Sequence, residues 1–434
     1  MKVQRFEWEG ASATADAVRA WAIEAVEDDN LTAEVSRIGT EVFKEGDEAL
    51  LQLTERLDGV SLTRARIKVD PGDAEAALEG LDPSLREAME LAAANIRSVA
   101  EAQAPDQPRT VELPQGQTVT VRELPVKAAG IYAPGGRATY PSSVLMCAIP
   151  ARVAGVERIA LVSPPSEDGR PSDSILAAAA LCEVDEIYAV GGAQAVFGLA
   201  FGTETIPKVD VVVGPGNVWV QEAKRRAFGE VGIDSYAGPS ELMLIAGHDT
   251  DPHWAAADLC AQAEHGPESP LLVVAVERAV LDDIVEKAEI AAGERPSVAD
   301  ARLATVQVPD LVDAIALANA FAPEHLELME EDAALLADRV TTAGCVFVGR
   351  HGATAFGDYV AGSNHVLPTA KSGRFAGPLG PGVFRRKIST VEIPAAAAAK
   401  LAPHADAIAR AEGFPVHGES AMIRAKDAKV KGQT

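Results

Sequence analysis

The chain has 434 residues, which at roughly 100–200 residues per domain is enough for two to four structural units. Alanine supplies much of its 47% hydrophobic share and aromatic residues make up 5%, a composition that favours helices packed on sheets over an all-β sandwich. Its 64 acidic and 39 basic residues give a formal net charge of −25, so it would repel nucleic-acid phosphates and anionic membranes, and we expect neither as a partner.

The N-terminal part of the chain, to about residue 120, is predicted to be mainly helical. Apolar residues recur at three- and four-residue steps through residues 14–27, 31–59 and 83–103. The polar segment 104–110, which contains prolines, then breaks this pattern.

Between Lys127 and Pro239 the chain alternates strand-like and helix-like segments. Four short apolar runs end at glycine or proline, and each is followed by a helical pattern; the runs span residues 127–136, 158–165, 186–192 and 209–216. Successive β-α units predict a parallel sheet covered by helices, in which ligands bind beyond the carboxyl ends of the strands.

A second α/β region follows, with strand-like and helix-like segments again alternating. The strand-like segments are 242–247, 271–276, 304–308 and 345–349, and the helix-like ones are 257–265, 280–293 and 310–321. We expect the N-terminal helices to pack here, which would make this domain discontinuous. The tail beyond Phe384 is too thin to hold a core alone, and we expect it to dock on a partner subunit.

Glycine-rich turns raise the question of a nucleotide. The chain has no intact G-x-G-x-x-G motif, but Gly214-Pro215-Gly216-Asn217 precedes a helix, and its backbone amides could meet a pyrophosphate or ribose. Tyr132 and the 191–194 turn are expected at the same edge of the sheet. The alternative is purely steric, because a tight β-α turn needs glycines in any case.

Four side chains are candidate metal ligands. Gln262 and His265 are three residues apart, on one face of a predicted helix. A histidine at a helix end is alternatively a favourable partner of the helix dipole. Asp358 and His417 are remote in sequence, but a Gln, His, Asp and His set would suit zinc.

Glu324 and His325 are the candidate acid–base residues. Pro323 cannot continue the preceding helix, so it is expected to end that helix and open a new turn. Histidine titrates near neutrality and is the usual proton acceptor. The alternative is a helix start that merely carries charge. The glycine-rich polar segment 357–375 and the segment around Ser240 also have the composition of functional loops.

The four cysteines lack CxxC spacing and are interpreted as reduced thiols, with a cysteine nucleophile disfavoured. The N-terminus has no apolar stretch of the secretory kind, and no run of apolar residues approaches membrane-spanning length. We therefore expect a cytoplasmic protein.

Six long motifs together resemble one known family. They are, in chain order, YPSSVLMCAIPARVAGV, VGGAQAVFGLAFGTETIPKVDVVVGPGN, IDSYAGPSE, AQAEH, APEHLEL and GDYVAGSNHVLPT. Their succession resembles histidinol dehydrogenase over residues 30–420. Gly266 departs from the pattern, because an acidic residue is expected after His265; this removes no expected ligand.

The resemblance implies a four-electron oxidation of L-histidinol through L-histidinaldehyde to L-histidine with two NAD, the last step of histidine biosynthesis. It implies one Zn²⁺ per subunit, which would hold the substrate's imidazole and amine. By motif match the expected ligands are Gln262, His265, Asp358 and His417, the expected catalytic pair is Glu324 and His325, the expected NAD contacts are Tyr132, Gln194 and Asn217, and the further substrate contacts are Ser240, His365 and Glu412. The four ligands and His325 are expected to contact the substrate as well.

The resemblance also implies two incomplete Rossmann-like α/β domains with parallel sheets, a helical N-terminal segment, a small tail domain and an intertwined homodimer. The expected parts are an N-terminal arm (1–30), a discontinuous domain with the metal and catalytic residues (31–126 and 240–382), an NAD-binding domain (127–239) and a tail (383–434) that docks on the partner. Glu412 and His417 are accordingly expected to act across subunits.

Three other functions are weighed. A related zinc- and NAD-dependent dehydrogenase could oxidise another small polar alcohol, such as a sulfonated diol. A zinc hydrolase could use Glu324 to polarise a metal-bound water, but the chain has no H-E-x-x-H motif and the β-α turns would then serve no cofactor. A binding protein without catalysis would leave the Glu, His and Asp residues unexplained.

Overall fold

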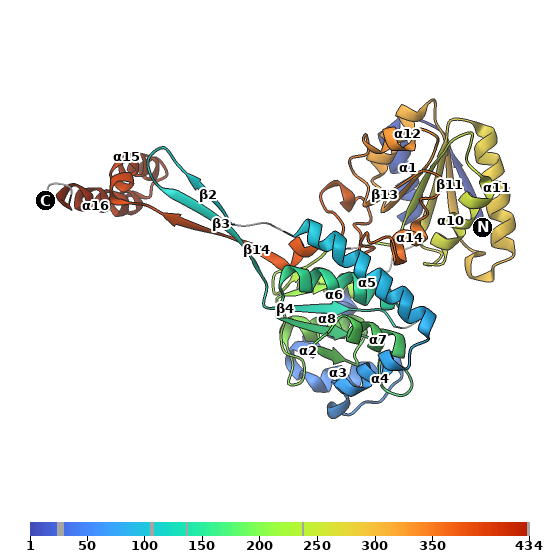
Figure 1. The fold of residues 1–434 in the computed structure, drawn as a ribbon, viewed down its shortest axis with the longest axis horizontal. Helices are drawn as coiled ribbons and strands as arrows, with labels where there is room; N and C mark the ends of the chain where they lie inside the picture. Colours follow the sequence, from blue (N-terminus) through green and yellow to red (C-terminus); the bar gives the residue numbers. More distant parts are fainter. Residues whose placement is uncertain (24–29, 105–107, 136–137, 237, 432–434) are drawn as a thin grey trace. The chain divides into compact units, whose positions relative to one another are not determined.

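The computed structural model describes residues 1–23, 30–104, 108–135, 138–236 and 238–431. The chain divides into two compact units. The main unit comprises residues 1–103 and 126–384, and the tail unit comprises residues 104–125 and 385–434 (Figure 1). None of the described helices is long and apolar enough to cross a membrane.

The main unit contains a six-stranded parallel sheet, sheet A, in the order β1-β11-β10-β9-β12-β13. The strands are β1 (Lys2–Phe6), β9 (Leu242–Ala246), β10 (Pro270–Ala275), β11 (Arg302–Gln307), β12 (His325–Met329) and β13 (Cys345–Val348). Helices cover both faces, so β9 and β10 are buried throughout, as expected of a parallel sheet. The helices of this region are α1 (Ala11–Ile23), α10 (Pro252–Ala263), α11 (Arg278–Gly293), α12 (Leu311–Phe321), α13 (Ala333–Ala337) and α14 (Thr354–Tyr359).

Side chains alternate between the two faces of sheet A along each strand, and this alternation determines which helices face His325. Leu242, Leu244 and Met329 share a core with α10 and α11, whereas Leu326 and Leu328 share one with α1 and α12. His325 has the parity of Met329, so its side chain is directed to the α10 face. The helix that carries Gln262 therefore covers the sheet face to which His325 belongs.

The main unit also contains a five-stranded parallel sheet, sheet B, in the order β6-β5-β4-β7-β8. Its strands are β4 (Ala128–Tyr132), β5 (Arg158–Val162), β6 (Glu186–Tyr188), β7 (Val211–Val213) and β8 (Gly232–Ile233). The crossover helices are α6 (Pro141–Ala154), α7 (Asp173–Leu181), α8 (Gly192–Phe201) and α9 (Val218–Ala227). The predicted α/β class with two parallel sheets is confirmed.

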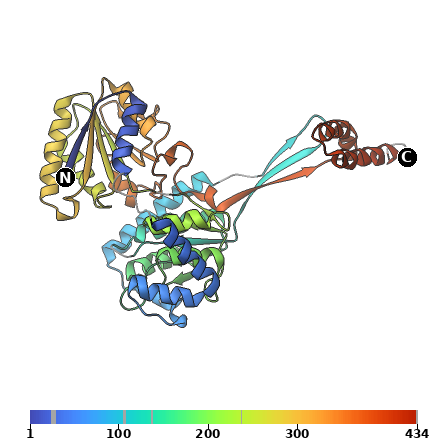
Figure 2. The ribbon, with the colours of Figure 1, turned by 180° about the vertical axis from the view of Figure 1, so that it is seen from behind.

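Of the N-terminal helices, α1 packs beside α12 on sheet A, as expected. The next four pack on sheet B, which corrects the expectation that residues 31–126 join residues 240–382. These helices are α2 (Leu31–Glu45), α3 (Asp47–Asp58), α4 (Pro71–Glu79) and α5 (Pro83–Gln103). Helices α2 and α3 pack on α8 and α9, and α4 and α5 pack on α7 and α6 (Figure 2). Gly39 shows why α2 fits there: a Cβ atom at this position would lie 2.9 Å from the ring of Phe197.

Two strands of sheet A were not predicted. Residues Lys2–Phe6 add an edge strand beside β11, so the N-terminal segment is not wholly helical. Strand β12 begins at His325, directly after Pro323 and Glu324, where a new turn was expected. Pairing with its neighbours β9 and β13 outweighs the intrinsic helix propensity of the Leu, Glu and Met residues in the LELM segment.

The tail unit consists of an antiparallel sheet and a helical hairpin. Its strands β2 (Arg109–Glu112), β3 (Thr118–Pro125) and β14 (Arg385–Glu392) pair in the order β14-β3-β2, and α15 (Ala395–Ala411) packs on α16 (Pro415–Lys431). The expected tail of helices and turns therefore also includes strands. Large apolar side chains remain exposed here, among them those of Ile408, Phe414, Val416 and Ile423.

Candidate active site

Glu324 and His325 lie at the amino end of β12, where it pairs with β9. The register sets His325 opposite Leu242, so Ser240 and Glu241 lie beside the catalytic candidates. The Glu324 carboxylate accepts hydrogen bonds through Oε2 from Ser240 Oγ at 2.6 Å and from the Glu241 backbone N–H at 2.8 Å. The site thus forms at the amino edge of sheet A, opposite to the carboxyl edge at which parallel sheets usually bind ligands.

The His325 ring is held from two sides. Its Nδ1 lies 3.0 Å from the carbonyl oxygen of Glu241 and its Nε2 lies 3.7 Å from Asp358 Oδ1. A carbonyl oxygen only accepts, so Nδ1 carries a hydrogen and donates it. Nε2 is therefore the ring atom available for proton transfer toward Asp358 and its surroundings.

Burial and charge shift the pKa values of this group. Burial raises the pKa of Glu324 to about 7, although His325 and the Ser240 hydroxyl favour its charged form. Burial alone would lower the pKa of His325, but Glu324 and Asp358 outweigh it and raise the pKa to about 9. Burial opposes ionisation of Asp358, yet neighbouring imidazoles, with His325 foremost, lower its pKa. A carboxyl group with a pKa near neutrality suits acid–base catalysis.

Three of the four expected metal ligands belong to the main unit. Gln262, which is 1% exposed, donates from Nε2 to Ser240 Oγ at 2.6 Å, and its Oε1 atom is buried without a hydrogen-bond partner. His265 follows the end of α10, and desolvation lowers its pKa, which favours the neutral imidazole that metals bind. Asp358 lies in the short helix α14 and favours its anionic form. A free amide oxygen, a neutral imidazole and a carboxylate are donors that fit a zinc ion.

The other two expected residues, Glu412 and His417, belong to the tail unit. Glu412 ends α15, and His417 lies in α16 with its ring 5.5 Å from that of Phe414. The main unit by itself therefore brings together the residues from Ser240 to Asp358 but supplies neither of these two.

His365 connects the loop after α14 to sheet B. Its Nδ1 lies 2.8 Å from the backbone oxygen of Asp358, and its Nε2 lies 3.2 Å from Ser143 Oγ in α6. Since the carbonyl accepts from Nδ1, the Ser143 hydroxyl donates to Nε2. Burial lowers the pKa of His365, consistent with this neutral tautomer.

The expected NAD residues gather at the carboxyl edge of sheet B. The Tyr132 hydroxyl accepts from the Gly192 N–H at 3.1 Å, and Gln194 is fully buried with neither amide atom hydrogen-bonded. Asn217 Oδ1 caps α9 by accepting from the N–H groups of Trp219 and Val220. Buried, unsatisfied polar atoms such as those of Gln194 are what a polar ligand would satisfy. The residues therefore fit a nucleotide cofactor.

Comparison with known proteins identifies the family. The histidinol dehydrogenase family model matches residues 22–425. The histidinol dehydrogenase of Zymomonas mobilis is 43% identical over 405 residues (91% of this chain, 93% of that one), and that of Burkholderia mallei is 40% identical over 442 residues (99% and 98%). The crystal structure of histidinol dehydrogenase from Elizabethkingia anophelis superposes with a TM-score of 0.90 at 31% identity, covering 99% of each chain.

The chain belongs to the histidinol dehydrogenase family. The resemblance seen in its six motifs is confirmed. The family is one of NAD-dependent dehydrogenases, and its reaction is the last step of histidine biosynthesis. This assignment removes the support for a zinc hydrolase.

Sequence reasoning missed several residues that support the histidinol dehydrogenase site. Lys224 donates to the carbonyl of Gly214 at 2.9 Å, Asp234 accepts from the N–H of the same Gly214 at 2.9 Å, and the two side chains form a buried ion pair. Arg19 forms another buried ion pair with Glu241. A lysine, an arginine and two acids are ordinary surface types. The only sequence signal was an arginine, Arg19, among the apolar positions of its helix.

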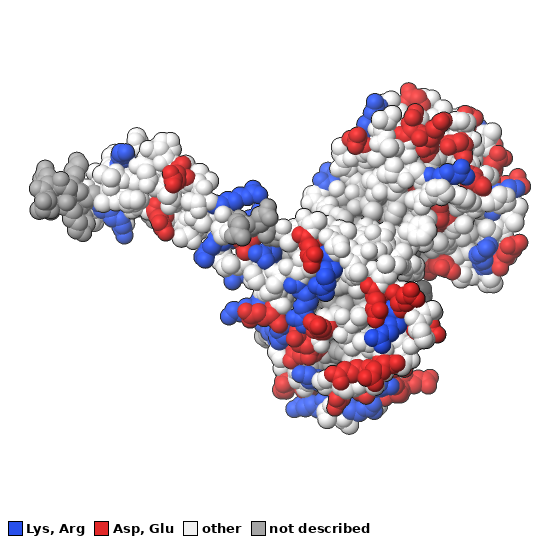
Figure 3. Space-filling view, viewed as in Figure 1, with Lys and Arg blue, Asp and Glu red and all other residues white. Residues whose placement is uncertain are grey.

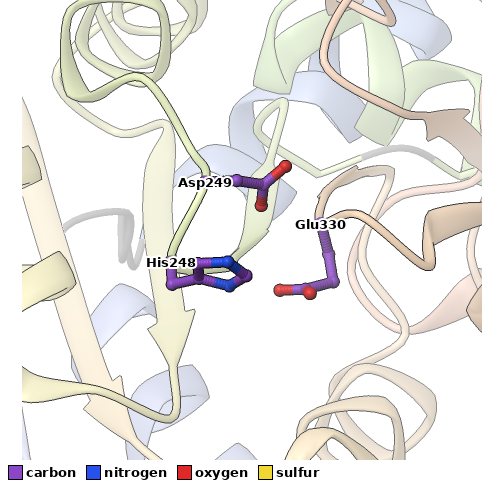
Figure 4. A group of neighbouring side chains, drawn as sticks. All are labelled: His248, Asp249 and Glu330. Atoms are coloured by element: carbon purple, nitrogen blue, oxygen red, sulfur yellow. The ribbon is translucent and has the colours of Figure 1, made fainter.

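A separate group of possible ligands lies at the opposite edge of sheet A. His248 and Asp249 follow β9 and Glu330 follows β12, and their ligand atoms lie within 4.8 Å of one another (Figure 4). None of the three belongs to the expected zinc set. On the face shown in Figure 3, acidic and basic side chains are interspersed over the main unit.

Proposed function

We propose that this chain oxidises L-histidinol through L-histidinaldehyde to L-histidine, reducing two NAD, at the site that contains Glu324 and His325. The observation that carries the proposal is the continuous set of contacts from Gln262 through Ser240, Glu324 and His325 to Asp358 in a member of the histidinol dehydrogenase family.

We infer that Gln262, His265, Asp358 and His417 hold one zinc ion. The unpartnered Oε1 of Gln262 and the neutral His265 support this inference. When bound, the zinc would hold the imidazole and the amine of histidinol and so fix the carbinol carbon in place, which replaces a chance encounter by positioning.

His325 is proposed as the base in both oxidations. Because Nδ1 is engaged by the Glu241 carbonyl, Nε2 is the ring atom that takes the hydroxyl proton of the substrate. With a pKa of about 9, His325 acts as this base in its neutral fraction, which grows as the pH rises toward 9. Loss of that proton raises the electron density on the oxygen, and the carbinol carbon then releases a hydride more easily. The neighbouring carboxylates of Glu324 and Asp358 stabilise the imidazolium that forms.

Glu324 is proposed to activate the water that hydrates the aldehyde. The second oxidation needs a hydrated aldehyde, because only the hydrate offers a hydroxyl proton and a hydride on the same carbon. A carboxyl group with a pKa near 7 exchanges protons readily at neutral pH. Ser240, which donates to Glu324, and His365 would contact the substrate beside it.

For the cofactor we propose that Tyr132, Gln194 and Asn217 line the NAD site. The amide atoms of Gln194, which have no hydrogen-bond partner, and the position of Asn217 at the amino end of α9 support this role. We propose an NAD-binding domain around sheet B. In contrast to the division expected from the sequence, this domain includes helices α2 to α5.

We further propose a homodimer in which the tail of one subunit completes the site of the other with Glu412 and His417. The support is the exposed apolar surface of the tail unit, including Phe414 and Val416, since large exposed apolar patches mark interaction sites. For a biosynthetic enzyme of this family we expect the cytoplasm as the location.

The test is product stoichiometry. The purified chain, loaded with zinc, should form two NADH for each L-histidinol consumed and release L-histidine. A sulfonated diol serves as the competing alcohol. Turnover of that diol without turnover of histidinol would replace the proposed substrate, and absence of NADH with either would overturn the proposal.

A further inference from the structure

We propose that Arg19 is a positioning residue which, through Glu241, holds both members of the Glu324–His325 pair in their working geometry. The inference deepens the proposed function and rests on the roles assigned there to these two residues. Arg19 lies in α1, more than two hundred residues before Glu241 in the sequence, and is 5% exposed.

The first link is a buried, forked ion pair. Arg19 Nη1 binds Glu241 Oε1, and Arg19 Nη2 lies 2.9 Å from Glu241 Oε2. Glu241 is 2% exposed, so both charges are removed from water. A bidentate guanidinium–carboxylate pair fixes direction as well as distance, which a single hydrogen bond does not.

The second link runs from Arg19 to the end of α12. Nη2 also donates to the carbonyl oxygens of Phe321 at 2.6 Å and Ala322 at 3.2 Å, and the guanidinium lies 3.7 Å from the centre of the Phe321 ring. Ala322 has a left-handed backbone (φ 51°), which turns the chain into Pro323 and Glu324. Arg19 therefore fixes the segment that introduces Glu324.

The third link is the backbone of Glu241. Its N–H donates to Glu324 Oε2 at 2.8 Å, and its carbonyl accepts from His325 Nδ1 at 3.0 Å and from the His325 N–H at 3.2 Å. One peptide segment thus orients the carboxylate of Glu324 and selects the ring nitrogen of His325 that carries the hydrogen. Arg19 binds this segment through the side chain of Glu241. It also binds the neighbouring segment, before Glu324, through the carbonyl oxygens of Phe321 and Ala322.

The consequence of losing Arg19 follows from burial. Without its partner, the Glu241 carboxylate would be a buried, uncompensated charge held only by the Ala370 N–H at 3.3 Å, and it would move toward water. Its backbone would move with it, so that His325 would lose the acceptor for Nδ1–H. Loss of such an orienting partner typically costs about 10- to 100-fold in activity.

The experiment compares Arg19→Met, Arg19→Lys and Arg19→Met combined with Glu241→Gln in the zinc-loaded enzyme. The matched control is Arg5→Met, which breaks the exposed Arg5–Asp282 pair on the same sheet. For each we measure kcat for aldehyde formation, KM for NAD, zinc content, thermal unfolding, and the low-field proton signal of the hydrogen-bonded His325 Nδ1–H, assigned by its loss in His325→Gln.

We expect Arg19→Met to lower kcat about 10- to 100-fold and to broaden or remove the His325 Nδ1–H signal, with KM for NAD and zinc content unchanged. Arg19→Lys should fall between Met and wild type, because lysine keeps the charge but not the fork. Arg5→Met should match wild type.

Wild-type kcat and an intact His325 signal in folded Arg19→Met would overturn the inference, as would equal loss of kcat and of cofactor affinity. If Arg19→Met does not fold, two other variants test the inference by their kcat and their His325 Nδ1–H signal. They are Arg19→Lys and the double variant with Glu241→Gln, in which no unpaired carboxylate remains buried. Absence of histidinol turnover in the wild type would instead refute the proposed function, whereas the NMR signal still tests the role of Arg19.

Discussion

Three glutamates near the amino edge of sheet A show how the partner decides the chemistry of one residue type. Glu241 is paired with Arg19, Glu324 with the Ser240 hydroxyl and a backbone N–H, and Glu327 accepts from the Thr354 N–H at 2.8 Å. Burial raises the pKa of Glu324 to about 7 and that of Glu327 to about 8. The Glu324 carboxylate also lies 3.5 Å from His325 Nδ1, so of the three it is the one placed beside the proposed base.

Glu324→Gln should separate the two oxidations. The amide keeps the hydrogen-bond geometry with Ser240 but cannot accept a proton from water. We expect aldehyde formation to change by less than about tenfold and aldehyde oxidation to fall by about 100-fold or more, as general-base loss predicts. Single-turnover measurement of each half-reaction decides this, with the exposed Glu331→Gln as control; an equal loss in both half-reactions would contradict the assignment.

His265→Ala should remove zinc, because it deletes one of four proposed ligands. Elemental analysis after dialysis should show a large loss of bound zinc, whereas the exposed His253→Ala in α10 should retain it. His248→Ala provides the discriminating control for the group in Figure 4. If His265→Ala retained zinc and His248→Ala lost it, the zinc site would have to be assigned to His248, Asp249 and Glu330 at the carboxyl edge of sheet A.

At the scale of elements, the glycine turn after β7 is built from outside its own motif. The carbonyl and N–H of Gly214 are bound by Lys224 from α9 and by Asp234 just after β8. Gly214 has φ 118°, and a Cβ atom there would lie 2.2 Å from the Tyr132 carbonyl oxygen. The turn therefore needs glycine for steric reasons, as one of the two interpretations held, and also carries the proposed cofactor residue Asn217.

Lys224→Met should weaken cofactor binding selectively. Loss of a buried hydrogen bond to a charged group costs about 1.5–3 kcal/mol, so we expect KM for NAD to rise about tenfold or more while KM for histidinol stays near wild type. The control is Lys208→Met, which breaks the exposed Lys208–Glu230 pair. An equal rise in both KM values would contradict a role specific to the cofactor turn.

Glu327 links β12 to α14 and gives a pH-dependent stability. Burial first and Asp258 second raise the pKa of Glu327 from 4.5 to about 8, while the Thr354 N–H and His325 oppose this. The folded chain thus keeps a proton that the unfolded chain releases, so stability falls as the pH rises from about 4.5 to about 8.

Glu327→Gln should therefore raise Tm relative to wild type at pH 8 more than at pH 5, because glutamine keeps the acceptor for Thr354 and carries no proton to lose. Thermal unfolding across this range measures the difference, and the exposed Glu331→Gln should show none. A constant difference in Tm between pH 5 and pH 8 would mean that Glu327 is not the titrating group.

For the molecule as a whole, the proposed active site would need residues of both units. Gln262, His265 and Asp358 belong to the main unit, and Glu412 and His417, which the proposal assigns to the partner's site, belong to the tail unit. Exchange of tails between subunits makes a specific prediction about mixed dimers.

His265→Ala and His417→Ala should each be inactive alone, but their co-expression should restore about a quarter of wild-type activity. Half of a statistical mixture is heterodimer, and in each heterodimer one site receives both intact residues if the tails are exchanged. Sites formed within single subunits would each keep one defect. No recovery in a mixture shown to contain heterodimers would contradict tail exchange.

The family and most of the helices and strands could be predicted from the amino-acid sequence. Six motifs were enough to identify histidinol dehydrogenase, because motifs of this length and order constrain backbone turns and side-chain types together. The alternation of apolar strands with amphipathic helices predicted both parallel sheets, since each element must bury one face. The glycines of the 191–194 and 214–217 turns were recognisable for the same local reason.

Which sheet each helix covers, and which distant residues contact one another, could be learned only from the tertiary structure. Residues 31–103 carry helical periodicity that is equally compatible with either sheet, and only complementary packing, such as Gly39 against Phe197, places them on sheet B. His325 begins a strand because β9 and β13 pair with it, and Arg19 reaches Glu241 only because α1 covers the sheet beside α12. These contacts join residues that are hundreds of positions apart, and periodicity within a short window carries no information about them.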